Sequence, residues 1–250
     1  MTETTDVLVS DAGGVRSIAM NRPDKRNALT AAMYQTMADA LLSADEDAAI
    51  GAVLISGRGG HFTGGNDLGD FMNNPPLTED NAVFRFLHAI LGFGKPVVAA
   101  VEGNAVGIGT TMLLHCDLIY AAPTARFSMP FVDLGLVPEA ASSLLVPRLL
   151  GHPRAAEMLM LGAPMSAEEA ARTGLINAVV PAEQLDAHAA KVAAALAAKP
   201  RTAMRHTKAL LRGDRGHTRE VMSREGRLFA EMLVSPEAKA AFAAFFAKKG

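Results

Sequence analysis

Short apolar runs alternate with longer amphipathic stretches in the first half of the chain. Apolar residues at 7–9 and 15–20 flank Gly13 and Gly14, a pattern that predicts a β-hairpin. Three further runs of consecutive apolar residues predict strands: 50–56, 97–101 and 118–121. Periodic apolar positions between the strands predict helices: one after Thr30, one over about Glu79 to Leu91 and one over 110–116. Strands that alternate with helices indicate an α/β fold.

From Pro138 onward, helical patterns dominate. They begin near Ser142, Pro153, Ser166, Ala182, Arg201 and Pro236, and only 175–180 resembles a strand. The Ala-rich segment 182–203 has high helix propensity but little side-chain volume for a core. We therefore expect a boundary near Lys199 and Pro200, with a core domain at 1–199 and a helical C-terminal region at 200–250.

Two glycine-rich loops follow predicted strands, at Gly57 to Gly69 and at Gly103 to Thr111. The second loop lacks both nucleotide-binding patterns, since Met112 stands where a dinucleotide loop has its third glycine and no Lys-Ser or Lys-Thr pair follows. Glycines between a strand and a helix let backbone N–H groups turn outward and bind an oxyanion. Tight turns alone would explain the same residues.

Glu139 is the candidate general base. It stands among apolar neighbours, Leu136, Val137, Ala140 and Ala141, and burial of its carboxylate would raise the pKa towards the range useful for proton transfer. On spacing alone, Pro138 and Glu139 also suit the first turn of a helix, where the macrodipole favours an acidic side chain.

Charge and composition narrow the class of function. The 24 Lys and Arg against 26 Asp and Glu give a net charge of −2, so no global basic field is available for nucleic acid or an anionic membrane, although local basic spots are compatible with it. The longest apolar runs, 192–198 and 240–247, are far shorter than the roughly 18 residues of a membrane span. The single Cys116 and a start without a signal pattern predict a cytoplasmic protein. A mean hydropathy of +0.18 favours an oligomer.

Five segments resemble the crotonase (enoyl-CoA hydratase/isomerase) family in order and spacing. They are Asn21-Arg22-Pro23 with 26–29, then 62–68, 103–109, 116–121, and 174–177 with Val180-Pro181. The resemblance runs through nearly the whole chain. It implies a crotonase-like spiral of ββα turns with a helical C-terminal trimerisation region, a homotrimer or dimer of trimers, and a coenzyme A thioester as substrate with no further cofactor.

The same resemblance assigns roles to particular residues. Family members hold the thioester oxygen between two backbone N–H groups, which fall on Asn66 and Ile108, and such donors are each worth on the order of 3 kcal/mol. Positions along the CoA path match Arg26, Ala28, Gly64, Asp67 and Leu68. Lys25 or Arg26 can meet CoA phosphates, although a solvated turn explains both cations as well.

Hydratases of this family carry two glutamates that flank a water molecule, and the matching positions here are Thr111 and Phe131, which cannot act as bases. The segments 129–131, 134–136 and 138–143 instead resemble the Δ3,Δ2-enoyl-CoA isomerases, whose catalytic carboxylate falls on Glu139. We therefore expect an enoyl-CoA isomerase with Phe131 at the substrate. Alternatives are a hydratase, a dienoyl-CoA isomerase, another crotonase reaction, or an acyl-CoA-binding oligomer without catalysis.

The remaining reactive side chains are interpreted mainly as structural. Asp133 is a weaker candidate to assist Glu139, and Asp67 suits a first helical turn better than a base. Cys116 is expected in the core, and the seven histidines lack metal-ligand spacing, so no metal is expected. An aromatic stripe near the C-terminus suits a core or a subunit interface, or by resemblance a CoA contact: Phe242, Phe245 and Phe246 with Lys248 and Lys249.

Overall fold

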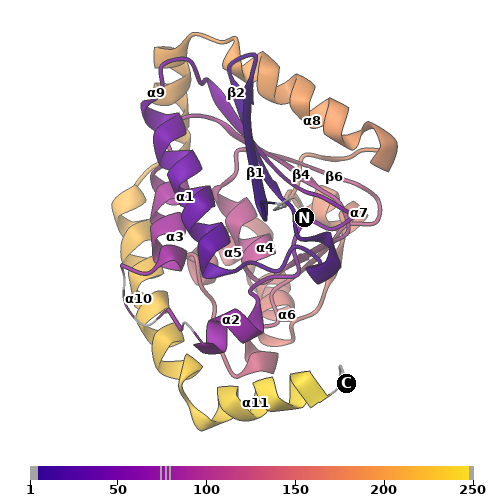
Figure 1. Cartoon of the computed structure of the whole chain (residues 1–250), viewed down its shortest axis with the longest axis vertical. Coiled ribbons are helices and arrows are strands. Elements are labelled where there is room, and N and C mark those ends of the chain that lie inside the picture. Colours follow the sequence, from indigo (N-terminus) through magenta and orange to yellow (C-terminus); the bar gives the residue numbers. More distant parts are fainter. Residues whose placement is uncertain (1–4, 74, 77, 79, 248–250) are drawn as a thin grey trace.

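A six-stranded sheet forms the centre of the molecule (Figure 1). The computed structural model describes residues 5–247 except 74, 77 and 79. The strands lie in the order β1-β2-β3-β4-β6-β9, and every neighbouring pair is parallel except the β1-β2 hairpin. Their bounds are β1 Val7–Ala12, β2 Val15–Met20, β3 Ala52–Gly57, β4 Val97–Val101, β6 Leu118–Ala121 and β9 Ala178–Val179.

A second, three-stranded sheet has the order β5-β7-β8. Its strands are β5 (Asn104–Val106), β7 (Arg126–Ser128) and β8 (Met165–Ser166). β5 follows β4 and β7 follows β6 along the chain, so a strand of the large sheet is succeeded by a short strand of the small one. This succession of two strands and a helix confirms the predicted α/β architecture.

Helices cover both faces of the large sheet. Their bounds are α1 Ala31–Glu46, α2 Leu68–Asn73, α3 Ala82–Gly92, α4 Ile108–Thr111, α5 Ser142–Leu150, α6 His152–Met160, α7 Ala167–Thr173, α8 Ala182–Ala197, α9 Arg201–Arg212, α10 Arg215–Leu233 and α11 Pro236–Ala247. The described residues also form the short 3-10 helices η1 Pro23–Lys25, η2 Met112–His115 and η3 Val132–Leu134. Figure 1 shows α1 and α3 on the side of the sheet opposite to α8. No helix in the described part of the chain is long and apolar enough to cross a bilayer.

The Ala-rich helix α8 forms a thin second core against the sheet. Val98 and Ala100 of β4 face α8, while the alternate residues of the same strand face the main core. The small Ala189, Ala193 and Ala197 allow a close approach, since a Cβ added at Gly51 would lie 2.8 Å from Ala197 Cα. The low side-chain volume noted in the sequence therefore serves a close helix-on-sheet contact.

Several predicted boundaries differ from the structure. The helix expected from Glu79 begins at Ala82 after the Asn81 cap, and Glu79 lies outside the described residues. The strand expected at 175–180 is limited to Ala178–Val179. The helix expected over 110–116 starts earlier, at Ile108, and continues as the 3-10 helix η2.

The C-terminal helices begin at Ala182, Arg201 and Pro236, as predicted. The sequence pattern did not predict the break between α9 and α10. At this break Gly213 has φ +58°, and Asp214 then caps α10. The proposed domain boundary at 199 and 200 stays a prediction.

Candidate active site

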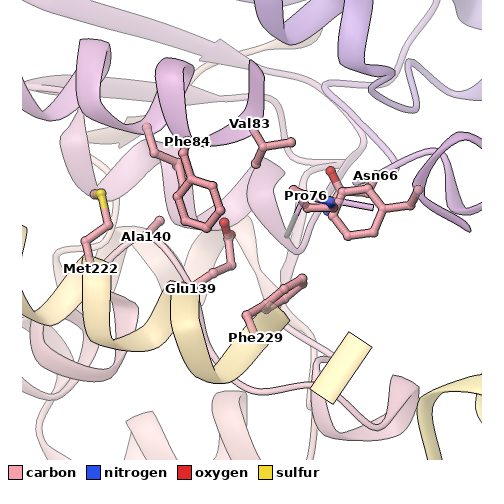
Figure 2. A pocket seen from close by; sticks show the side chains of 11 residues that line it. Asn66, Pro76, Val83, Phe84, Glu139, Ala140, Met222 and Phe229 are labelled. Carbon is pink, nitrogen blue, oxygen red and sulfur yellow. The ribbon is translucent and has the colours of Figure 1, made fainter. Parts of the chain in front are cut away.

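An apolar cavity that contains the Glu139 carboxylate lies between α3 and α10. Its lining residues are Asn66, Phe71, Pro76, Val83, Phe84, Leu87, Glu139, Ala140, Met222, Gly226 and Phe229, around about 340 Å³ of space that is partly open to solvent. Figure 2 shows Glu139 between the rings of Phe84 and Phe229. Among the lining residues that the structure describes, only Glu139 has an ionisable side chain near neutral pH.

Glu139 is buried, with 7% of its surface exposed, and the Thr111 hydroxyl donates to Glu139 Oε1 at 2.5 Å. Burial raises the pKa of Glu139 to about 7; the Thr111 hydrogen bond lowers it in part, and repulsion from Glu225 raises it further. A carboxyl group with this pKa can accept a proton and return it at neutral pH.

Glu139 lies in a turn before α5. The alternative in which Pro138 and Glu139 begin a helix is wrong, because α5 starts at Ser142. Ala140 and Ala141 both have positive φ, +59° and +60°, which reverses the chain between Glu139 and the helix. The backbone of this turn holds Glu139 at the cavity wall, away from the first helical turn.

The two glycine-rich loops are joined through their backbones. The N–H of Thr63 donates to Asn104 O at 2.9 Å, and the N–H of Val106 donates to Thr63 O at 3.1 Å. Gly65 has φ +90°, and a Cβ added there would lie 3.0 Å from Val106 O. Glycine at 65 therefore satisfies both the backbone angle and the close approach of the second loop.

The predicted oxyanion donors, Asn66 and Ile108, follow these joined segments. Within the described part of the chain, neither of their N–H groups donates to a backbone carbonyl. The N–H groups of the neighbouring Asp67 and Gly107 each donate to a carbonyl at 2.8 Å. Two backbone donors thus remain available on adjoining loops.

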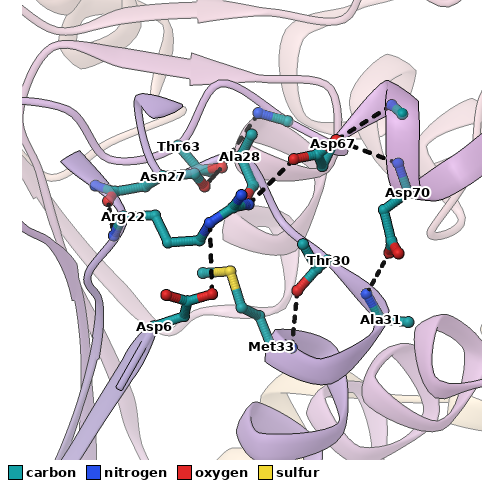
Figure 3. A network of polar contacts seen from close by, with 12 residues as sticks. Asp6, Arg22, Asn27, Ala28, Thr30, Ala31, Met33, Thr63, Asp67 and Asp70 are labelled. Atoms are coloured by element: carbon teal, nitrogen blue, oxygen red, sulfur yellow. Dashed lines mark hydrogen bonds and ion pairs between the residues drawn. The ribbon is translucent and has the colours of Figure 1, made fainter. Parts of the chain in front are cut away.

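A buried asparagine braces the first loop (Figure 3). Asn27 Oδ1 accepts from the N–H of Arg22 at 2.8 Å, and its Nδ2 donates to Arg58 O and His61 O at 2.9 and 2.7 Å. Asn27 O accepts from the Thr63 hydroxyl at 2.6 Å. Asn27 has φ +55°, a conformation that Asn tolerates better than most residues. No local pattern within the segment 26–29 indicates this role of Asn27.

The predicted CoA-path residues lie on two adjacent segments: Arg26, Ala28, Gly64, Asp67 and Leu68. The N–H of Gly64 donates to Arg26 O at 2.7 Å, which places 26–29 beside 64–68. Lys25 and Arg26 are exposed on this rim. Geometry alone thus brings the predicted residues together, while their role towards CoA stays a prediction.

Asp67 has a structural role at the start of α2. Its Oδ1 accepts from the N–H groups of Gly69 and Asp70 at 3.1 and 3.2 Å, and its Oδ2 pairs with Arg22 at 3.2 Å (Figure 3). Burial raises the pKa of Asp67, but these hydrogen bonds and the Arg22 charge outweigh it and lower the pKa below its ordinary value. A carboxylate held this way is a poor proton acceptor, which supports its interpretation as a helix-start residue.

Two other candidates lie apart from the cavity lining. Phe131 is buried behind it, in an edge contact with Phe229 at 6.5 Å between ring centroids. Asp133 is exposed, and a Cβ added at Gly162 would lie 2.9 Å from Asp133 Oδ2. Asp133 therefore does not reach the wall that carries Glu139.

Three buried polar side chains near Glu139 carried no local sequence signal: Tyr34, His115 and Glu225. The Tyr34 hydroxyl donates to Asn66 Oδ1. Burial, and then the nearby Glu139, raise the pKa of Tyr34 well above its usual value, so this phenol is neutral. The proximity of Tyr34, His115 and Glu225 to Glu139 depends on how α1, η2 and α10 pack.

The remaining expectations concern Cys116 and the C-terminal stripe. Cys116 is buried as predicted, and burial raises the pKa of its thiol to about 12. Phe242 is buried, whereas Phe245 and Phe246 are exposed in the single chain; Lys248 and Lys249 lie outside the described residues. No group of three potential metal-ligating side chains occurs among the described residues.

Comparison with known proteins identifies relatives over nearly the whole chain. The family described as enoyl-CoA hydratase/isomerase matches residues 10–250. Enoyl-CoA delta isomerase 2 of Rattus norvegicus is 38% identical over 84% of this chain and 55% of its own length. A probable enoyl-CoA hydratase of Mycobacterium leprae is 32% identical over 97% of this chain and 95% of its own length. The chain spans 55% to 64% of the length of the delta isomerases that it matches.

Solved structures of similar proteins superimpose closely. Pseudomonas aeruginosa OdaA has a TM-score of 0.94 at 46% identity, covering 97% of this chain and 99% of that one. An enoyl-CoA hydratase/isomerase from Pseudoalteromonas atlantica T6c has a TM-score of 0.94 at 42% identity, covering 98% of each chain. The chain therefore belongs to the enoyl-CoA hydratase/isomerase family and has the crotonase fold.

Proposed function

We propose that this protein is an enoyl-CoA isomerase that converts a 3-enoyl-CoA into the conjugated 2-enoyl-CoA. The observation that carries the proposal is the Glu139 carboxyl in an apolar cavity, the only group ionisable near neutral pH among the described lining residues, with a pKa of about 7. The isomerisation needs one group that removes a proton from C2 and returns it to C4. Its equilibrium lies towards the product because conjugation stabilises the 2-enoyl thioester.

The reaction balances with Glu139 as the only proton carrier. Its carboxylate takes the C2 proton, and the C–H electron pair delocalises over the thioester oxygen and C4 as a dienolate. The backbone N–H groups of Asn66 and Ile108 donate to that oxygen. The protonated Glu139 then delivers the proton to C4, the negative charge leaves the oxygen, and the carboxylate is restored.

The neighbours of Glu139 favour isomerisation over hydration. A hydratase of the resembled type needs two carboxylates to hold and activate water, and the corresponding positions carry the Thr111 hydroxyl and the buried Phe131 ring. Thr111 donates a hydrogen bond to Glu139 and has no basic group of its own. The surrounding aromatic and aliphatic side chains offer few partners for a water nucleophile.

The thioester arm of CoA is expected to cross the rim formed by 26–29 and 64–68. Arg26 and Lys25 are exposed there and can pair with phosphates. We expect a homotrimer or dimer of trimers. The exposure of Leu210 and Leu211 on α9, 84% and 83% in the single chain, favours association of subunits.

The test is an assay panel of 3-hexenoyl-CoA, crotonyl-CoA and a dienoyl-CoA with purified protein. We expect 3-hexenoyl-CoA to become the 2-enoyl thioester, and Glu139→Gln to reduce turnover about 10³-fold without loss of thioester binding. Thr36→Ala, an exposed change on α1, is a matched control that should retain activity. Preferential hydration of crotonyl-CoA would identify a hydratase, and thioester binding without turnover would identify a binding protein.

A further inference from the structure

The turn that carries Glu139 has a backbone conformation that is unfavourable for its sequence. Ala140 and Ala141 are consecutive, buried and both left-handed, with φ of +59° and +60°. Alanine avoids this region because its Cβ crowds the backbone carbonyl. Other contacts must therefore hold the turn.

A carboxylate from α10 provides two of these contacts. Glu225 Oε2 accepts from the N–H of Ala141 at 2.6 Å, and Glu225 Oε1 accepts from the N–H of Ser143 at 2.9 Å. Glu225 is only 5% exposed. Each oxygen thus binds one amide at the junction between the turn and α5. Burial raises the pKa of Glu225, and the hydrogen bonds from Ser143 and Ala141 lower it in part because they favour the charged carboxylate.

His115 holds the carbonyl side of the same turn. Its Nε2 lies 2.9 Å from Ala140 O, so Nε2 carries the hydrogen and donates. Burial lowers the pKa of His115 to about 4, with nearby Arg212 and Lys208 acting in the same direction, so the ring is neutral at pH 7. Glu225 thus accepts hydrogen bonds from two backbone amides of this region, and His115 donates one to a backbone carbonyl of the same turn.

Glu225 also acts on Glu139 through space. Among the described residues, the groups that face Glu139 are the Thr111 hydroxyl on α4, the neutral Tyr34 phenol on α1, the Asn66 amide and apolar side chains of α3 and α10. The Glu225 carboxylate raises the pKa of Glu139 by repulsion. Its removal should therefore disturb both the position and the protonation of Glu139.

We propose that Glu225 is a positioning residue, which holds the left-handed Ala140–Ala141 turn and thereby directs Glu139 into the cavity. The catalytic consequence rests on the proposed function, in which Glu139 carries the proton. The structural part, that Glu225 sets the conformation of the turn and the titration of Glu139, is independent of which reaction the protein performs.

The first experiment replaces Glu225 with its amide in the full chain. Glu225→Gln keeps one acceptor and loses the charge, so we expect turnover of 3-hexenoyl-CoA to fall about 10- to 100-fold. The pKa of Glu139, followed by NMR of carboxyl-labelled glutamate without substrate and assigned by its absence in Glu139→Gln, should become lower. Glu231→Gln, an exposed change on the same helix, should alter neither quantity.

A second experiment distinguishes loss of the turn conformation from general destabilisation of the protein. Glycine adopts positive φ freely, so Glu225→Gln should cost several-fold less turnover in an Ala140→Gly/Ala141→Gly background than in the parent chain. An equal loss in both backgrounds, or an unchanged Glu139 titration in Glu225→Gln, would overturn the proposal. If the parent protein turns over no enoyl thioester, the isomerase assignment fails, while the NMR titration still tests the role of Glu225.

Discussion

The two sides of the candidate site are built from different parts of the chain. On the oxyanion side, the loops around Thr63 and Val106 are joined by backbone hydrogen bonds, and the proposed donors are themselves backbone N–H groups. On the base side, Glu139 depends on side chains from three other elements, Thr111, His115 and Glu225.

This difference determines how each side responds to substitution. The oxyanion side, which is built from backbone groups, should tolerate changes of exposed side chains. It should lose activity where an added Cβ forces the two loops apart. On the base side, single polar substitutions should change the pKa and the position of Glu139. Three experiments, in order of expected effect, test this contrast.

The largest effect is expected for Gly65→Ala. The new Cβ would combine an unfavourable φ of +90° with a 3.0 Å approach to Val106 O, which displaces the Asn66 N–H. Loss of one oxyanion donor costs about 10²- to 10³-fold in kcat. Gly60→Ala is the matched control, since Gly60 has φ +76° but no atom within 4 Å of an added Cβ. Equal losses of kcat in both variants would contradict the importance of the loop contact.

The second prediction concerns how the free energy of unfolding depends on pH. The folded pKa of Glu139 is about 7, above the ordinary 4.5, so the folded state binds this proton more tightly than the unfolded state. The resulting stabilisation is full below about pH 4.5 and is lost as pH rises through 7. Relative to wild type, Glu139→Gln should therefore gain about 3 kcal/mol in unfolding free energy between pH 4.5 and pH 8. Urea unfolding at both pH values measures this gap, and a constant difference would show that Glu139 titrates normally.

The smallest effect is expected for Thr111→Val. The Thr111 hydroxyl stabilises the ionised Glu139, so its removal should raise the pKa of Glu139 and move the acidic limb of kcat/KM to higher pH. At pH 7 we expect about a tenfold loss, in line with one hydrogen bond to a charged group. Thr111→Ser retains the hydroxyl and should keep the wild-type profile. Identical pH profiles for the Val and Ser variants would exclude this hydrogen bond as a determinant.

Local signals predicted a large part of the fold. The starts of α8, α9 and α11 follow Pro or begin at Pro, and the hairpin follows from Gly13 and Gly14. Prediction was weaker where a contact decides the element: β9 has only two residues because its pairing with β6 is that short. A strand of this length has too little pattern to delimit from sequence.

The sequence by itself predicted the candidate site residues and determined which loops have the backbone freedom to approach one another, because glycine spacing, apolar neighbours and helix-start residues act within a few positions. Only the tertiary structure decided that Glu139 lies in a buried turn and that Glu225, far along the chain, binds the amides of that turn. The physical reason is that burial and hydrogen bonding between distant segments depend on how α10 packs against α3 and α5. No pattern around either glutamate encodes that packing.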